Sequence, residues 1–232
     1  MRFSFARSTF ETEMNKGALT RQRIIEEAAP IFNQRGYAGC SMQDILDATG
    51  LEKGGVYRHF ASKEELAVEA FRYALANTVR TRTEHLEEIP NAIDKLRHAI
   101  RHFIESPSFL PGGCPVMNTA IDSDDGNPEL RRLAREAIRN WRARLAKIVE
   151  DGIRSGEVNK TVEPRRIANT IIATLEGALM ISRLEGSRNA MKDVQASLET
   201  MLRGISSQEN RVPGRLPLRS PRQSPLKNRQ KT

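Results

Sequence analysis

The stretch SMQDILDATGLEKGGVYRHF, from Ser41 to Phe60, decides how the chain is organised. Ser41 is a typical helix N-cap residue, because its hydroxyl can accept a hydrogen bond from a free N–H group of the first helical turn. The apolar residues that follow it recur at helical spacing: Met42, Ile45 and Leu46. Gly50 can adopt the left-handed conformation that ends a helix at little cost. The pattern therefore predicts a short helix that closes in a tight turn.

A second short helix, expected from about Lys53 to Phe60 with Val56 and Phe60 facing inward, completes a helix-turn-helix. Its two glycines, Gly54 and Gly55, each cost a helix about 1 kcal/mol relative to alanine. They indicate either that a partner surface approaches closely or that the helix has little stability to lose. Lysine, arginine and tyrosine side chains can bind phosphate oxygens, and base edges are read in the major groove. Taken alone, the two helices would also suit a small solvated pair inside any helical protein.

The segments on either side narrow this interpretation. Upstream, Thr20 is expected to cap a helix that runs to about Gln34. Downstream, Ser62 and Glu65 have the spacing of a capping box. The whole region 20–76 resembles the DNA-binding domain of the tetracycline-repressor (TetR/AcrR) family of transcriptional regulators. The motifs that carry the resemblance are TRQRI at 20–24, the segment from Phe32 to Gly36-Tyr37, Ser41 with Ile45, TGL at 49–51, KGGVYRHF at 53–60 and SKEEL at 62–66.

The resemblance covers about a quarter of the chain and implies an N-terminal head that binds double-stranded operator DNA. Gly55 departs from the family pattern, which more often has a small hydroxyl residue or alanine there, and this departure bears on which operator bases are preferred. The residues expected to bind phosphate are Lys53, Tyr57, His59 and Lys63. Those expected nearest the bases are Gly54, Gly55 and Arg58. Thr20, Ser41 and Gln43 complete the expected DNA-binding set.

The chain has 232 residues, a hydrophobic fraction of 38% and a formal net charge of +8. The segment after Ser206 holds seven basic residues against Glu209, so it carries +6 of that charge. Prolines at every fourth position there exclude a helix, and we expect 206–232 to be a disordered basic tail. Residues 1–16 are expected to form a disordered N-terminal extension, with Met14 as an alternative start.

Several classes of protein are not favoured by the sequence. It has no apolar run of about 18 residues and no secretory signal, so we expect a cytoplasmic protein without membrane contact. Cys40 and Cys114 are too few for a disulfide scaffold. No P-loop, dinucleotide-binding glycine pattern, catalytic triad order or zinc set occurs, so no enzyme activity, cofactor or metal is expected. The acidic loop at 122–128 lacks the glutamate of a calcium loop, and His98 with His102 lacks a third ligand.

The remaining sequence predicts an all-α fold of about nine helices, with a three-helix head and a helical body. The first body helix starts near Lys63 and reaches towards Glu88, and its charged half from Arg80 onward is expected to be solvated. Further helices are expected at about 90–105, 114–121, 128–152, 164–184 and 188–202. We place the DNA-binding head at 17–77 and the effector-binding and dimerisation body at 78–205.

The helix expected at 164–184 is apolar on two sides. One stripe comprises Ile167, Ile171, Leu175 and Ala178, and the other comprises Ala168, Ile172 and Leu179. A surface helix needs only one apolar face, so the second packs either in the core or on another chain. In the family that the chain resembles, the last two long helices form a four-helix bundle with their copies. We therefore expect a homodimer, with Leu198 as an interface residue, and a near-palindromic operator.

The resemblance also implies a cavity for a small-molecule effector in the body. The residues assigned to it are Phe71, Phe103, Met117, Asn118, Trp141 and Leu175, a mostly apolar set that would equally suit an ordinary core. Cys114 follows two glycines and opens a helix, where the helix dipole lowers the pKa of a thiol, so it is a candidate reactive thiol. The alternative for Cys114 is a small buried residue in a tight turn.

These features together predict a ligand-responsive transcriptional regulator, most simply a repressor that a small molecule releases from its operator. Two alternatives stay open. One is a transcriptional activator of the same fold. The other is a helical interaction protein that binds acidic partners through its basic tail.

Overall fold

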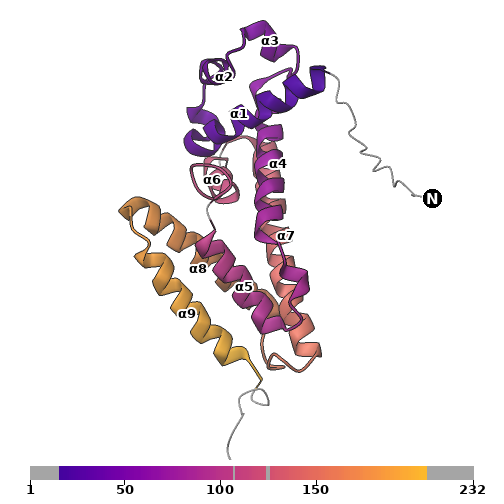
Figure 1. Ribbon diagram of the computed structural model, residues 1–232, viewed down its shortest axis with the longest axis vertical. Helices are drawn as coiled ribbons and strands as arrows, with labels where there is room; N and C mark the ends of the chain where they lie inside the picture. The colour runs from indigo at the N-terminus through magenta and orange to yellow at the C-terminus, as the bar shows by residue number, and fades with distance from the viewer. Residues whose placement is uncertain (1–15, 107, 124–125, 208–232) are drawn as a thin grey trace, which may run out of the picture.

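The computed structural model describes residues 16–106, 108–123 and 126–207, which form nine α-helices and one short 3-10 helix. The predicted all-α fold is confirmed. Figure 1 shows a small head at one end of an elongated helical body. The expected N-terminal extension and basic tail lie almost entirely outside the described residues. The elements are α1 (Lys16–Gly39), α2 (Met42–Thr49), α3 (Lys53–Tyr57), α4 (Lys63–Arg82), η1 (Leu86–Glu88), α5 (Ala92–Glu105), α6 (Pro115–Asp122), α7 (Pro128–Arg154), α8 (Pro164–Glu185) and α9 (Asn189–Ile205).

Helix α1 begins at Lys16, before the predicted cap at Thr20. Thr20 lies inside it, and its hydroxyl donates to the Lys16 carbonyl at 2.9 Å, so Thr20 is not the N-cap. A threonine hydroxyl can bond back to the carbonyl four residues earlier, which the sequence pattern alone does not distinguish from a cap. At the other end Gly36 leaves the helical conformation with φ +74°, where the predicted break lies. A Cβ at Gly36 would collide with the Asp122 carboxylate, so that side chain would have to move.

Helix α2 begins and ends as predicted. The Ser41 hydroxyl accepts from the Asp44 N–H at 3.2 Å, and the Asp44 carboxylate accepts from the Ser41 N–H at 2.8 Å. The hydrogen bonds from the Ser41 side chain and backbone, with Arg35 nearby, lower the pKa of Asp44 to about 2. Gly50 ends the helix with φ +64°. Helix α3 is shorter than expected and ends at Tyr57.

The head closes around one small core. Its buried members come from α1, α2, α3 and α4 and include Ile24, Ile25, Ala28, Cys40, Ile45, Val56, Phe60 and Leu66. Val56 and Phe60 are both buried, as predicted. The Arg21 guanidinium lies 4.7 Å from the Phe60 ring centroid and covers it from outside. Because α4 contributes Leu66 to this core, its first turn belongs to the head.

Helix α4 then runs from the head into the body. Ser62 caps it, accepting from the Glu65 N–H at 3.2 Å, while the Glu65 carboxylate accepts from the Ala61 N–H at 2.7 Å. In a capping box the carboxylate would accept from the N–H of the cap residue, Ser62. Here it accepts from the N–H of Ala61, one residue earlier. The helix ends at Arg82 and not at Glu88, because the chain turns through a left-handed residue, His85.

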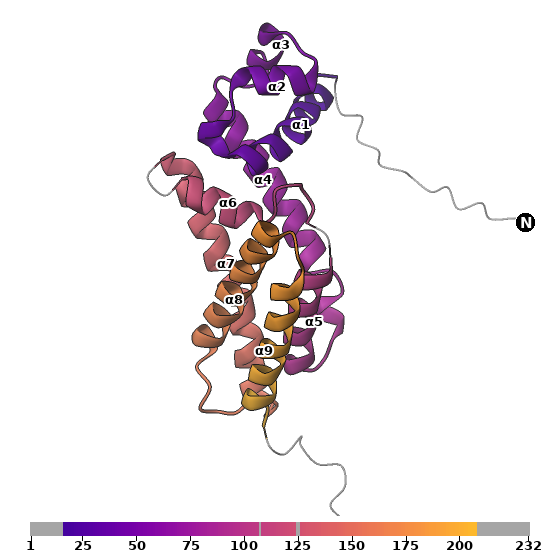
Figure 2. The same ribbon diagram turned by 90° about the vertical axis from the view of Figure 1, so that its left-hand side faces the viewer.

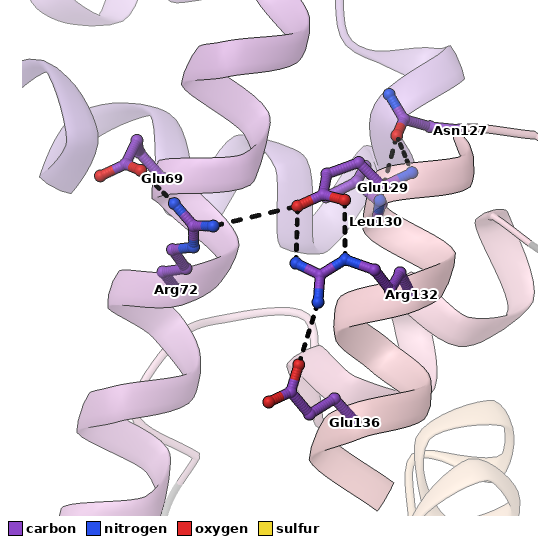
Figure 3. A network of polar contacts seen from close by, with 7 residues as sticks. All are labelled: Glu69, Arg72, Asn127, Glu129, Leu130, Arg132 and Glu136. Atoms are coloured by element: carbon purple, nitrogen blue, oxygen red, sulfur yellow. Dashed lines mark hydrogen bonds and ion pairs between the residues drawn. The ribbon is translucent and has the colours of Figure 1, made fainter.

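A charged network holds the middle of α4 against the start of α7 (Figure 3). Asn127 caps α7 by accepting from the N–H groups of residues 129 and 130, both at 3.0 Å. The Glu129 carboxylate accepts two hydrogen bonds of 2.8 Å from Arg132 and lies 3.9 Å from the Arg72 guanidinium of α4. Exposed ion pairs each contribute little to stability, so this network adds at most a small amount to the packing of α4 against α7.

The largest core lies among α5, α7, α8 and α9, and both apolar stripes of α8 belong to it. The second face of α8 therefore packs within the chain. Figure 2 shows α8 and α9 side by side on one side of the body. Among the described helices, α8 is also the one long and apolar enough to span a membrane by length and composition. Of its most apolar stretch, 33% is buried inside the chain.

A third stripe of α8 remains exposed towards its C-terminal end. Met180, Ile181 and Leu184 are 55%, 41% and 80% exposed. A Cβ added at Gly177, one turn earlier, would meet no heavy atom within 4 Å. By contrast Leu198 of α9 is only 2% exposed. The expectation that Leu198 is an interface residue is wrong, because that side of α9 faces the core of its own chain.

The last described residues, Ser206 and Ser207, are attached to the body. Val158 and Ser206 form an antiparallel bridge, and the Ser207 N–H donates to the Glu157 carbonyl at 3.0 Å. The body therefore continues through Ser207.

Candidate functional site

The tip of the head, farthest from the body in Figure 1, is formed by α3 and the turn before it. Val56 is buried beneath α3, so the opposite side of this short helix faces outward. Lys53, Gly54, Tyr57 and Arg58 are exposed there, and His59 is half-buried. The Lys53 ammonium lies 5.8 Å from the Tyr57 ring centroid. This brings together most of the residues expected to meet phosphate.

Of the two glycines of α3, Gly54 leaves open space beside these side chains, and Gly55 faces Leu51. A Cβ added at Gly54 would meet no heavy atom within 4 Å, and one added at Gly55 would meet Leu51 at 3.5 Å, an ordinary contact. Neither glycine is therefore required for packing within the chain. The arrangement suits close approach of a nucleic-acid backbone and base edges.

Other residues in the expected DNA-binding set have internal roles. Ser41 is engaged in capping α2, and the Gln43 amide donates to Asp47 at 2.7 Å on the exposed side of α2. The Lys63 ammonium donates to the Cys40 carbonyl at 2.6 Å and lies 4.2 Å from the Tyr37 ring centroid. Lys63 thus joins the start of α4 to the segment between α1 and α2.

A cavity of about 220 Å³ lies inside the body, between α4, α5, α6, α7 and α8. Phe103, Trp141 and Leu175, from the expected pocket set, line it, and so does Cys114. The Phe103 and Trp141 rings are stacked with centroids 5.8 Å apart. Most of the remaining wall is aliphatic, so the cavity can hold an apolar molecule.

The structure places the other three expected pocket residues elsewhere. Phe71 and Asn118 line a much smaller space of about 30 Å³ where α1, α4 and α6 meet, and Met117 packs against the neighbouring apolar cluster. The sequence predicted Phe71 on an apolar helix face, and Met117 and Asn118 in a short, mainly apolar helix. It could not show on which side of α4 and α6 each would lie.

Comparisons with known proteins found matches to both the head and the body of this chain. Residues 24–70 match the model of bacterial regulatory proteins of the tetR family, and residues 92–198 match the tetracyclin repressor-like C-terminal domain. The crystal structure of a TetR transcriptional regulator from Chloroflexus aurantiacus J-10-FL is 41% identical, with a TM-score of 0.78 over 83% of this chain and 98% of that chain. The chain belongs to the TetR family of transcriptional regulators. The resemblance found in the sequence is thereby confirmed.

Two further relatives extend the comparison. A regulator of the family from Cytophaga hutchinsonii is 36% identical, with a TM-score of 0.78 over 84% of this chain and 98% of that chain. The HTH-type transcriptional repressor DhaR of Mycobacterium sp. (strain GP1) is 26% identical over 172 residues, 74% of this chain and 86% of DhaR.

In this TetR-family chain, hydrogen bonds tie the cavity wall to the end of α1 in the head. The Asn33 amide donates to the carbonyls of Pro111 and Gly113 at 2.7 and 3.2 Å, just before cavity residue Cys114. The Asn118 amide donates back to the Asn33 carbonyl at 2.9 Å, and Asp122 accepts from the Tyr37 N–H at 2.7 Å. Helix α6 and the loop before it therefore contact the cavity on one side and α1 on the other.

The environment of Cys114 differs from that expected of a reactive thiol. Its side chain is buried at the start of α6, and burial raises its pKa well above the ordinary value. The carboxyl of Glu176 raises it further, and the N–H groups of Val116 and Met117 lower it by less. The helix start does act in the expected direction, but loss of solvent outweighs it.

Most of the cavity wall was not predicted from the sequence, including the polar residues Arg82 and Ser108. Arg82 lines the cavity although it lies in the half of α4 expected to be solvated, and Ser108 lines it from the loop after α5. The signal for Arg82 was its place two turns after apolar Leu75, on the same side of the helix. Arginine is usually solvated, so sequence pattern favoured the wrong side.

Proposed function

We propose that this TetR-family chain is a repressor that binds a near-palindromic operator as a homodimer in the cytoplasm. A small, largely apolar molecule in the 220 Å³ cavity would release it from the DNA. The observation that carries the proposal is that α4 and α6 line the cavity and also contact the head. A molecule that moves either helix would change the position of the head.

The proposed dimer uses the exposed stripe of α8. Met180, Ile181 and Leu184 form an apolar surface, and Gly177 beside them allows close approach of a second helix. Two heads held by such an interface would meet two half-sites about 34–36 Å apart, one turn of B-DNA. This spacing is the reason for proposing a near-palindromic operator.

The required coupling is modest. A coupling free energy of about 1–3 kcal/mol between cavity and head changes operator affinity about 5–150-fold. Linkage requires that operator DNA weaken effector binding by the same factor.

The proposal is tested by selecting genomic DNA fragments on the purified full-length protein and then screening small molecules for release. Trp141 lines the cavity, so its fluorescence should change when a releasing molecule binds. Trp141→Phe should weaken the response to that molecule. A compound that displaces the protein but leaves Trp141 emission unchanged, with Trp141→Phe responding normally, would show that the effector binds elsewhere.

Repression is distinguished from activation by placing the selected operator before a reporter gene. Expression should fall when the protein is present and recover when the effector is added. Among relatives, DhaR is described as a repressor, which supports repression for this chain. Expression that rises with the protein would instead identify an activator of the same fold.

A further inference from the structure

Among the described residues, the cavity wall carries a partly buried cation, Arg82 on the last turn of α4. One N–H of its guanidinium donates to the His102 carbonyl at 3.0 Å, and the group lies 4.2 Å from the Phe103 ring centroid. Burial lowers the pKa of Arg82, which reflects the cost of holding a charge there. Within the described residues, no carboxylate oxygen lies within 4.0 Å of its nitrogen atoms. A guanidinium has five N–H donors, and the His102 carbonyl accepts from one of those of Arg82. Within the described residues, its other donors can therefore still meet an acidic group.

The charges around Arg82 leave the cavity positive. Arg144 also lines it, on the exposed side of α7, and the described lining residues include no aspartate or glutamate. The nearest acidic influence is Glu176 of α8, which is only 2% exposed and whose oxygens have no hydrogen-bond partner of ordinary geometry. Burial raises the pKa of Glu176, and the Cys114 thiol and the charge of Arg82 lower it by less, so the carboxyl is held towards the neutral form.

The rest of the cavity wall indicates the size and the apolar character of the ligand. An engineered cavity of about 150 Å³ holds benzene, so the space of about 220 Å³ here suits a molecule of one substituted ring or a short aliphatic chain. The stacked Phe103 and Trp141 rings offer a surface on which such a body can pack.

We propose that the cavity takes a small amphipathic carboxylate, whose apolar body packs between Phe103 and Trp141 and whose acidic group pairs with Arg82. This inference rests on the proposed effector role of the cavity and assigns the chemical class of the effector. The pairing would give a carboxylate partner to a guanidinium that has none within 4.0 Å among the described residues.

The test compares 3-phenylpropanoate with 3-phenylpropanamide, which have the same body but differ in charge. Binding to the full-length protein is measured by calorimetry and by Trp141 fluorescence. The wild-type protein should bind the acid about 10- to 100-fold more tightly than the amide, because a hydrogen bond to a charged group is stronger than a neutral one. Arg82→Gln should bring the two affinities together while amide binding is retained.

Three further variants control for other causes. Arg82→Lys keeps the charge and should retain part of the preference for the acid. This variant also tests the role of the charge if Arg82→Gln is poorly folded. Arg144→Gln should keep most of the preference. Glu176→Gln should keep or strengthen it, since it removes only a nearby carboxyl.

The outcomes separate this inference from the proposed function. Equal binding of acid and amide by the wild-type protein, or an unchanged preference in Arg82→Gln, overturns the inference and leaves an apolar effector possible in the same cavity. A preference for the acid that depends on Arg82, without any effect on operator affinity, supports the inference and overturns the switching role. If neither compound binds at millimolar concentration, both the carboxylate class and the effector role of this cavity are wrong for molecules of this size.

Discussion

At Gly54 the backbone of α3 has open space where a side chain would begin. We predict that Gly54→Ala leaves the free energy of unfolding unchanged or raises it by up to about 1 kcal/mol, because alanine favours a helix over glycine. Operator affinity should fall, because the added methyl group occupies the space proposed for the bases. Denaturant unfolding and DNA titration on the same preparation measure the two effects.

Gly55→Ala is the matched control for this prediction. Its Cβ would meet Leu51 at 3.5 Å, so it packs inward and should affect operator affinity less. Equal operator affinity for Gly54→Ala and wild type would show that the DNA does not approach this side of α3.

The Cys114 thiol should react slowly in the folded protein. Its pKa is raised by burial, and each pKa unit lowers the thiolate fraction about tenfold at a given pH below the pKa. We predict that iodoacetamide at pH 8 labels Cys114 far more slowly in the native protein than in urea, as measured by peptide mass spectrometry. Cys40, also buried with a raised pKa, serves as the internal comparison. Labelling of native Cys114 at the unfolded rate would restore the reactive-thiol hypothesis.

At the scale of the element, α8 combines two buried stripes with one exposed stripe. We predict that Leu184→Glu converts the proposed dimer to a monomer, because it places a charge in the surface that would be desolvated between two copies. Light scattering at micromolar concentration measures the change in mass. Helical circular dichroism should stay unchanged, since Leu184 is 80% exposed within its own chain.

The control for Leu184→Glu is Ile121→Glu on α6, which is 69% exposed and lies outside the proposed interface. It should remain dimeric. Leu198→Glu is unsuitable as an interface probe, because this residue is buried in the core and the charge should unfold the body. A monomeric wild-type protein would contradict the dimer proposal directly.

At the scale of the whole molecule, the basic segment after Ser207 should be dispensable for folding. Ser206 and Ser207 are bonded to Val158 and Glu157, so a truncation must retain both. We predict that the chain ending at Ser207 keeps its melting temperature and its preference for the operator. It should lose only nonspecific DNA affinity at low salt, because the removed segment carries most of the net charge.

Titrations of operator and unrelated DNA at two salt concentrations check this prediction. The truncated protein should show a shallower dependence on salt for unrelated DNA. Loss of operator preference would mean that the segment takes part in specific recognition.

The sequence by itself determined the head of this protein. The Ser41 cap, the left-handed Gly50 and the inward Val56 and Phe60 depend on interactions within a few turns of chain, and the structure has each of them as predicted. The family followed from the same segment, because its motifs are local and ordered along the sequence. The approximate positions of the body helices followed from apolar spacing and proline breaks.

Only the tertiary structure decided which residues share the cavity. Phe103, Trp141 and Leu175 line it, whereas Phe71 and Asn118 face the junction with the head, because the crossing of α4 and α6 sets which side each residue occupies. The same packing turned Arg82 inward. It also reversed the expected shift of the Cys114 pKa, since burial by distant segments outweighs the local effect of a helix start. Periodicity identifies a buried face, but the neighbours of that face come from parts of the chain far away in sequence.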